Sequence, residues 1–232
     1  MARKFSTALR NAILGANVTT GALTTISSSS TGNKILDSAN GMKIFQPGDK
    51  ISVPAALIAG GYGTVVTVQT DGSYLTVSET CEDQSAGSEY TVSLCNRRAF
   101  RDIFANGILE IYSGSPPADA DTMESGTKLL RITATSAAVT PGMATNGLNF
   151  DAPAAGVLSK AAGEIWSGVA LATGTAGWFR FYTNMYHTGS GTDKVRFDGS
   201  ISTSGAQLNL SSVSIVEGAT TTIDTFTITL GA

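Results

Sequence analysis

Apolar and polar residues alternate along much of this chain, with the period of two that is typical of half-buried β-strands. In the stretch KVRFDGSI, for example, Val195 and Phe197 alternate with two charged residues. Roughly seven or eight short segments of this kind follow one another in the second half of the chain, separated by turns rich in glycine, serine and proline. The predicted strands include ILEIY at 108–112, LLRIT at 129–133, one that starts at 147–150, TAGWFRFY at 175–182 and TIDTFTITL at 222–230. Asp198-Gly199 is expected to be a turn or a bulge. The pattern predicts an all-β fold in which residues 98–232 form a β-sandwich or jelly-roll-like main domain.

The first half of the chain carries a strong hairpin signal. The segments TVVTVQ and SYLTV flank Thr70-Asp71-Gly72, and an Asp-Gly pair favours a tight turn because both residues tolerate positive φ. Further alternation at Tyr90 and Val92 predicts another strand. We therefore expect residues 18–97 to form a small β-domain or a large β-insertion.

Residues 1–17 are predicted to form a short helix or an arm. Phe5, Leu9 and Ile13 follow the spacing of one helical face. A single short helix is marginal alone and must pack on something. That surface is either this chain's own domain or a neighbouring subunit, so these three residues are possible interface residues.

The densest aromatic group lies in TAGWFRFY, which ends at Tyr182. Strand alternation places Phe179 and Phe181 on one face, and we expect that face to be core. Trp178 and Arg180 share the opposite face, which predicts a position at a surface or an interface.

Charged residues make up only 14% of the chain and hydrophobic residues 42%, with a net charge of −3. That balance supplies no basic field for nucleic acid. No apolar run approaches the roughly 20 residues that cross a bilayer, and polar residues interrupt the basic N-terminus where a signal peptide would be apolar. We expect no nucleic-acid partner, no membrane, and synthesis in a cytoplasm without a cleaved leader.

Two cysteines, Cys81 and Cys95, could close a disulfide loop. Without an export signal, free thiols are the more ordinary state, so the disulfide stays a possibility. Two cysteines and the single His187 do not supply a closed structural zinc site. We expect no metal and no cofactor.

Three further groups of residues invite a catalytic or metal-binding interpretation. His187 has no nucleophile motif near it in sequence. Asp119, Asp121 and Glu124 form an acidic loop that lacks the spacing of a calcium motif. A polysaccharide hydrolase would need paired carboxylates across a cleft, and no spacing favours any pair among the candidate acids. These candidates are Glu110, Asp151, Glu164 and Asp198. We therefore expect no enzyme and no catalytic residues.

The second half of the chain resembles a family of small virion structural proteins of tailed bacteriophages. The resemblance rests on FRDIFANGILEIYSGSPPADADT, IWSGVALATGTAGWFRFY, KVRFDGSISTSGAQLNL and TTTIDTFTITL, and on the N-terminal FSTALRNAILG. It covers roughly residues 99–232 and implies that residues 18–97 are an insertion. It also implies a β-fold in many copies per virion, with copies of itself and capsid, connector or tail proteins as partners. Decoration (cement), neck or collar, and tail positions all fit, and no functional residues carry over.

An alternative function is a host-surface or carbohydrate-binding module of a tail fibre or receptor-binding protein. It predicts exposed aromatic side chains near Trp178 and a host-surface glycan as the ligand. Both hypotheses place the protein in the virion after synthesis in the bacterial host's cytoplasm.

Overall fold

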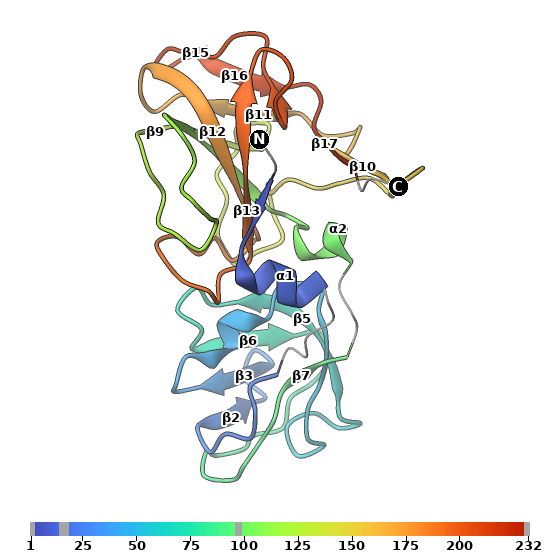
Figure 1. Ribbon diagram of the computed structural model, residues 1–232. Helices are drawn as coiled ribbons and strands as arrows, with labels where there is room; N and C mark the ends of the chain where they lie inside the picture. Colours follow the sequence, from blue (N-terminus) through green and yellow to red (C-terminus); the bar gives the residue numbers. More distant parts are fainter. Residues whose placement is uncertain (1–2, 14–18, 96–98, 230–232) are drawn as a thin grey trace. The chain divides into compact units, whose positions relative to one another are not determined.

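The computed structural model describes residues 3–13, 19–95 and 99–229. Strands dominate these residues, so the all-β prediction is confirmed (Figure 1). The chain divides into two compact units. The main unit holds Met1–Leu14, Ala99–Val139 and Thr145–Ala232, and the inserted unit holds Gly15–Arg98 with Thr140–Ala144. The helices of the described residues are α1 (Thr7–Ile13), the 3-10 helix η1 (Gly41–Ile44) and α2 (Phe100–Ile103).

The main unit is built on a nine-stranded sheet. The path of the sheet runs through β1 (Lys4–Phe5), β13 (Arg196–Ser202), β12 (Gly174–Tyr182), β8 (Ile108–Ser113), β9 (Lys128–Ala134), β11 (Trp166–Val169) and β16 (Thr220–Ile223). Two short strands lie off this path. They are β14 (Leu208–Asn209), parallel to β13, and β15 (Ser214–Ile215), antiparallel to the start of β12. The predicted strands ILEIY, LLRIT and TAGWFRFY correspond to β8, β9 and β12.

One face of this sheet carries the apolar core. Phe179 and Phe181 are fully buried there, as their alternation along β12 predicts. The register sets Phe181 opposite Phe197 of β13, and the two rings stack with centroids 5.4 Å apart. Trp166 of β11 joins the same cluster, so one continuous core binds the strands together.

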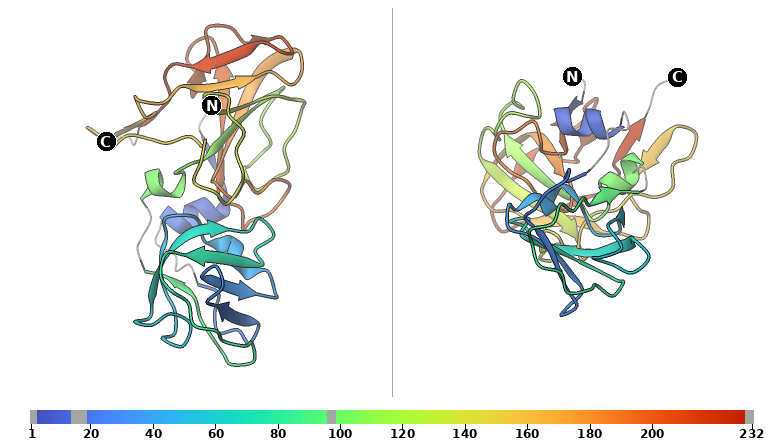
Figure 2. Two further views of the ribbon diagram at one scale, coloured as in Figure 1. Left: turned by 180° about the vertical axis from the view of Figure 1, so that it is seen from behind. Right: turned by 90° about the horizontal axis from the view of Figure 1, so that it is seen from below.

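The C-terminal segment TIDTFTITL, predicted as one strand, forms two. β16 ends at Ile223, and β17 (Thr227–Thr229) pairs with β10 (Val157–Ser159) in a separate two-stranded ribbon (Figures 1 and 2). The break between them places Phe226 in the core, where its side chain is buried. The interruption allows Ile223 and Phe226, three residues apart, both to be buried, which uninterrupted strand alternation would not permit.

The N-terminal segment folds onto its own unit. β1 pairs with β13, and the Ser6 hydroxyl accepts hydrogen bonds from the backbone N–H of Leu9 (3.2 Å) and of Arg196 (3.2 Å). Ser6 is thus the N-cap of α1. Leu9 is fully buried in the core. The sequence left open whether residues 1–17 pack on their own domain or on a neighbouring subunit, and the described part of them packs on its own domain.

The inserted unit is a six-stranded sheet that closes on itself. Its order is β2 (Ile26–Ser29), β3 (Lys34–Asp37), β6 (Tyr74–Val77), β5 (Tyr62–Val68), β4 (Lys50–Ser52) and β7 (Ser93–Leu94). Bridges between Thr19 and Ser93 and between Leu23 and Tyr90 join the two ends. The predicted hairpin is present as β5–β6, and its Gly72 has a φ of +80°.

Some elements differ from the predictions. α2, β10 and β15 were not predicted, and the expected strand at residues 147–150 forms only isolated bridges. The pair Asp198-Gly199, predicted to be a turn or bulge, lies in the middle of β13. A Cβ at Gly199 would lie 2.5 Å from the ring of Phe179, so the glycine permits close packing there instead of a turn.

Candidate functional site

The second face of the main sheet carries buried charge. Trp178 and Arg180, predicted to lie at a surface or interface, are both fully buried, so that prediction is wrong for the folded chain. The alternation separated the two faces of β12 correctly. The second face is buried because loops 114–127 and 183–195 provide backbone and side-chain partners for its charged groups. We call its charged and hydroxyl side chains the polar cluster, defined as Glu110, Tyr112, Glu124, Lys128, Arg131, Arg180, Tyr182, Tyr186, Arg196 and Asp198.

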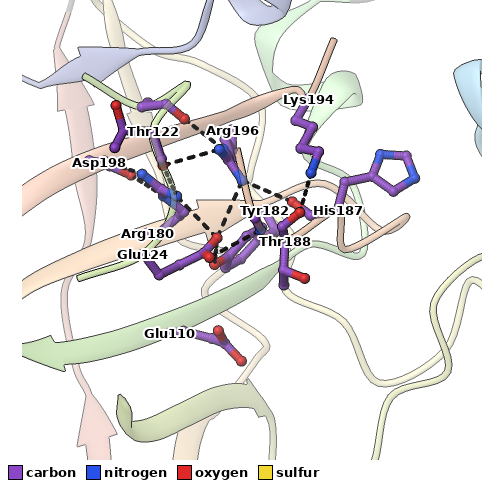
Figure 3. Close-up of polar contacts among 12 residues, drawn as sticks. Glu110, Thr122, Glu124, Arg180, Tyr182, His187, Thr188, Lys194, Arg196 and Asp198 are labelled. Carbon is purple, nitrogen blue, oxygen red and sulfur yellow. Dashed lines mark hydrogen bonds and ion pairs between the residues drawn. The ribbon is translucent and has the colours of Figure 1, made fainter. Parts of the chain in front are cut away.

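Arg180 is held by two carboxylates. Its guanidinium donates to Asp198 in bidentate geometry, with Nε–Oδ1 at 2.6 Å and Nη2–Oδ2 at 2.7 Å (Figure 3). Its remaining Nη1 donates to Glu124 at 3.0 Å and to the carbonyl oxygen of Thr122 at 2.9 Å. Such a fork is among the strongest polar contacts in proteins, and it connects β12 and β13 with the loop that carries Glu124.

Arg196 ties the covering loops to the sheet. Its side chain donates to the carbonyl oxygens of Ala120 (2.6 Å), Asp121 (3.1 Å) and His187 (3.2 Å). Glu124 accepts from Arg196 at 3.3 Å and from the Tyr182 hydroxyl at 2.8 Å (Figure 3). A single fully buried guanidinium therefore donates to several loop carbonyl oxygens and joins both loops to the sheet.

Glu110 is the second anionic centre of the polar cluster. Its fully buried carboxylate accepts from the hydroxyls of Tyr112 (2.6 Å) and Tyr186 (2.8 Å). The same carboxylate forms ion pairs with two cations of β9, Arg131 at 2.9 Å and Lys128 at 3.1 Å. With this many donors the carboxylate is occupied on all sides, as a buried charge requires.

The surroundings shift several pKa values in this cluster. Burial raises the pKa of Tyr182 and of Tyr112 above the ordinary tyrosine value, and neighbouring groups add to the shift. Burial also raises the pKa of Asp198, against the opposing effect of Arg180. For Glu124, burial acts upward, but hydrogen bonds from its own backbone, Tyr182 and Gly189 outweigh it and lower the pKa.

Trp178 packs within the same face. Its ring stacks on Tyr112 with centroids 4.6 Å apart and planes 15° from parallel, and the Arg180 guanidinium lies 5.4 Å from the Trp178 ring. A carbohydrate platform needs an exposed ring, so the exposed Trp178 expected for a glycan-binding module is not present in the folded chain.

The acidic loop is used for internal contacts. Asp121 binds the backbone N–H of Thr7 at 2.8 Å and its hydroxyl at 2.6 Å, and Asp119 caps its own turn by accepting from Thr122. Within the residues that the structure describes, no three acidic, cysteine or histidine side chains group as a metal site would need. The loop thus anchors α1 and supplies Glu124 to the polar cluster.

The four candidate acids of a hydrolase are likewise engaged. Glu110 and Asp198 are paired with cations as described above. Asp151 accepts from Ala162 N–H at 3.0 Å, and Glu164 binds Asn149 (2.8 Å) and the Trp166 indole N–H (2.8 Å). Each of the four acids therefore has a hydrogen-bond or ion-pair partner within the chain.

The remaining candidates lie apart from the polar cluster. Phe5 packs against the core and Ile13 is 47% exposed. Cys81 is buried and Cys95 is exposed, and both are free thiols. The cluster as a whole was not predicted, although its members share a signal. Charged residues stand between large apolar ones in the strands ILEIY, WFRFY and VRFD, which marks them as paired and buried.

Comparisons with protein-family models, with curated proteins and with solved structures find no match for this chain. Among the described residues, no helix has the length and apolar character needed to cross a membrane.

Proposed function

We propose that the protein is a structural component of a tailed-bacteriophage virion, present in several copies as a decoration (cement), neck or tail protein. The observation that carries the proposal is the resemblance of the four segments between residues 99 and 232. In this role its partners are copies of itself and capsid, connector or tail proteins.

The distribution of charge is consistent with such a role. Arg180, Arg196 and Asp198 are fully buried and paired with one another or with the loops. The main unit also exposes large apolar side chains, with Ile165 at 59%, Leu171 at 56% and Val216 at 57%. Exposed apolar side chains are suited to contacts with other proteins.

Quantitative mass spectrometry of purified virions tests the proposal. Isotope-labelled peptides of this chain and of the major capsid protein serve as standards, and particles from a strain with an amber mutation in this gene serve as the control. We expect a fixed stoichiometric ratio. Hundreds of copies would indicate decoration or repeated tail layers, and six or twelve would indicate a neck or baseplate. Fewer than one copy per particle would overturn the proposal.

A further inference from the structure

Two buried tyrosine hydroxyls meet inside the polar cluster. The hydroxyl oxygens of Tyr112 and Tyr182 lie 3.2 Å apart. On its other side the Tyr112 hydroxyl lies 2.6 Å from Oε2 of Glu110, and the Tyr182 hydroxyl lies 2.8 Å from Oε1 of Glu124 (Figure 3). Three contacts therefore connect four side chains, from β8 across β12 to the loop 114–127. We call these four side chains, Glu110, Tyr112, Tyr182 and Glu124, the tyrosine row.

The tyrosine row has one hydrogen too few for its three contacts while both glutamates are ionised. A phenol carries a single hydrogen, and an ionised carboxylate only accepts. Tyr112 donates to Glu110 and Tyr182 donates to Glu124, so no hydrogen is left for the contact between the two hydroxyl oxygens. Any other assignment of the two hydrogens moves the deficit to a different contact. One additional proton would complete the row.

The two oxygens of Glu110 differ in how many donors they accept. Oε1 accepts from the hydroxyl of Tyr186 at 2.8 Å, and it pairs with Arg131 at 2.9 Å and Lys128 at 3.1 Å. Among the described residues, Oε2 has the Tyr112 hydroxyl as its donor. A proton on Oε2 therefore displaces one donor, and that donor can turn toward Tyr182 because a hydroxyl hydrogen rotates to suit its surroundings.

The other end of the tyrosine row is less suited to the additional proton. Oε1 of Glu124 accepts from Arg180 at 3.0 Å and from Arg196 at 3.3 Å, besides Tyr182. Oε2 of Glu124 accepts from the backbone N–H of Gly189 at 3.1 Å. A proton on either oxygen would face an N–H group that cannot turn away. The vacancy for a proton is thus at Glu110.

We propose that Oε2 of Glu110 is a proton-binding site, and that a proton from solvent bound there turns the Tyr112 hydroxyl toward Tyr182. Glu110 then donates to Tyr112, Tyr112 donates to Tyr182, and Tyr182 donates to Glu124. One proton is taken up and no covalent bond of the protein breaks. Acid thereby joins β8 to the loop 114–127 by an unbroken row of hydrogen bonds. The proposal rests on the geometry of the row and not on the virion role.

Charges around Glu110 determine when the proton enters. Lys128 and Arg131 bind its carboxylate from β9, and Arg180 lies opposite Glu110 in the register of β12 and β8. These three cations outnumber the one anion of the row, Glu124, and favour the ionised form of Glu110 at neutral pH, so the proton enters on acidification. Solvent reaches this part of the cluster, since the side chains of Lys128 and Arg131 are 36% and 34% exposed.

Carbon NMR of the full-length protein with ¹³Cδ-labelled glutamate tests the proposal between pH 8 and pH 3. Loss of one signal in Glu110→Gln assigns Glu110. We expect this signal to titrate while the protein is folded. In Tyr182→Phe its midpoint should fall by about 0.5 pH unit or more, because the protonated form loses the acceptor for the Tyr112 hydroxyl. The ionised form keeps every donor to Glu110 in that variant.

Tyr186→Phe is the matched control, because it removes a hydroxyl that donates directly to Glu110. That hydrogen bond favours the ionised carboxylate, so its loss should raise the midpoint of Glu110. The proposal therefore expects two Tyr→Phe substitutions to act in opposite directions. Tryptophan fluorescence at each pH reports whether the main unit is folded, since Trp166 is buried in its core.

A second measurement needs no substitution in the row. In the unaltered protein with ¹³Cζ-labelled tyrosine, the Tyr182 signal should move at the midpoint of Glu110, although its hydroxyl contacts Tyr112 and Glu124 instead. A Tyr182 signal that follows Glu124 alone would overturn the proposal. So would an unchanged or higher Glu110 midpoint in Tyr182→Phe. Unfolding before the Glu110 signal moves would overturn it as well, because the folded cluster would then hold no proton there.

Discussion

At the scale of single residues, the polar cluster shows how a β-protein can hold charge inside. Arg180 and Asp198 are removed from water, and their bidentate contact offsets a large part of the cost of burying the two charges. Such a pair is weak evidence for net stability, because two apolar residues of similar volume often do as well. Breaking it from one side is costly, since the remaining charge stays buried and unpaired.

Replacement of Arg180 by methionine should therefore lower the free energy of unfolding of the main unit by about 3–5 kcal/mol. The double variant Arg180→Met/Asp198→Leu should recover a large part of that loss. Urea unfolding followed by tryptophan fluorescence measures both, because the two tryptophans of the chain, Trp166 and Trp178, lie in the main unit.

Arg10→Met is the matched control, because Arg10 is exposed and its side chain donates to the Thr7 hydroxyl on the same helix. We expect it to change stability by less than about 0.5 kcal/mol. Equal effects of Arg10→Met and Arg180→Met would contradict the assigned role of the buried pair.

The cysteines give a second prediction at this scale. Burial, with Glu79 and Glu82 nearby, raises the pKa of the Cys81 thiol to about 11, and Cys95 is exposed. A thiol reagent at pH 8 should modify one cysteine of the native protein and two in denaturant. Cys95→Ser should leave the native protein unreactive toward the reagent. The native Cys81→Ser variant should still react, at Cys95. Two reactive thiols in the native state of the unaltered chain would show that Cys81 is accessible.

At the scale of elements, α1 shows what its neighbours contribute. Its helical periodicity is visible in the sequence, but the sequence left open which surface it covers. Ser6 and Asp121 bind the first turn of α1, and Leu9 packs into the core of the main unit. These contacts determine which surface the helix covers. The contact between Thr7 and Asp121 joins residues 114 positions apart, which local periodicity does not report.

Leu9→Ala should destabilise the isolated protein by about 2–4 kcal/mol, because it leaves a cavity in the core. Ile13→Ala on the same helix should cost less than about 1 kcal/mol, since that side chain is 47% exposed. Thermal unfolding followed by tryptophan fluorescence compares the two. Similar effects of both substitutions would mean that the helix does not pack on this unit.

The strands were predictable where residues of one face pack on one core. β5, β6, β8, β9 and β12 were found from alternation and turn residues alone. The short strands β10 and β15 were not, because they have only three and two residues and depend on partners far away in sequence. The polar cluster carries a local signal, charged residues between large apolar ones, but that signal does not show which loops cover Arg180.

At the scale of the whole molecule, the chain consists of two units with separate apolar interiors. In the inserted unit Ile51, Val65 and Leu75 are buried, and none of them belongs to the core of the main unit. Because the sheet closes on itself, its strands have few unpaired backbone groups.

The two units should consequently respond to different substitutions. Ile51→Ala should lower the stability of the inserted unit by about 2–5 kcal/mol and shift the far-UV circular dichroism transition. The tryptophan transition should stay in place, because both tryptophans lie in the main unit. A shift of both transitions by the same amount would indicate a single cooperative unit.

Acid should weaken the main unit. The pKa of Glu124 is lowered in the folded state, so the unfolded chain takes up its proton first as the pH falls. Stability from this group is present above the ordinary pKa of 4.5 and is lost as the pH drops through the lower, folded value. The raised pKa of Asp198 has the opposite effect on stability, because the folded chain takes up that proton before the unfolded chain does.

Urea unfolding at pH 7, 5, 4 and 3 should show this decline by tryptophan fluorescence. Glu124→Gln should be less stable at pH 7 and should show a flatter dependence on pH. An unchanged slope in that variant would assign the acid sensitivity to other carboxylates.

The two ends of the inserted unit lie next to each other, since the N–H of Thr20 donates to the carbonyl oxygen of Val92 and Thr19 bridges Ser93. Neighbouring strands that pair in this way have Cα atoms about 5 Å apart. A short turn could span that distance as readily as the whole unit does. The position is therefore suited to exchange, and a chimaera could carry in its place any foreign domain whose own termini are equally close.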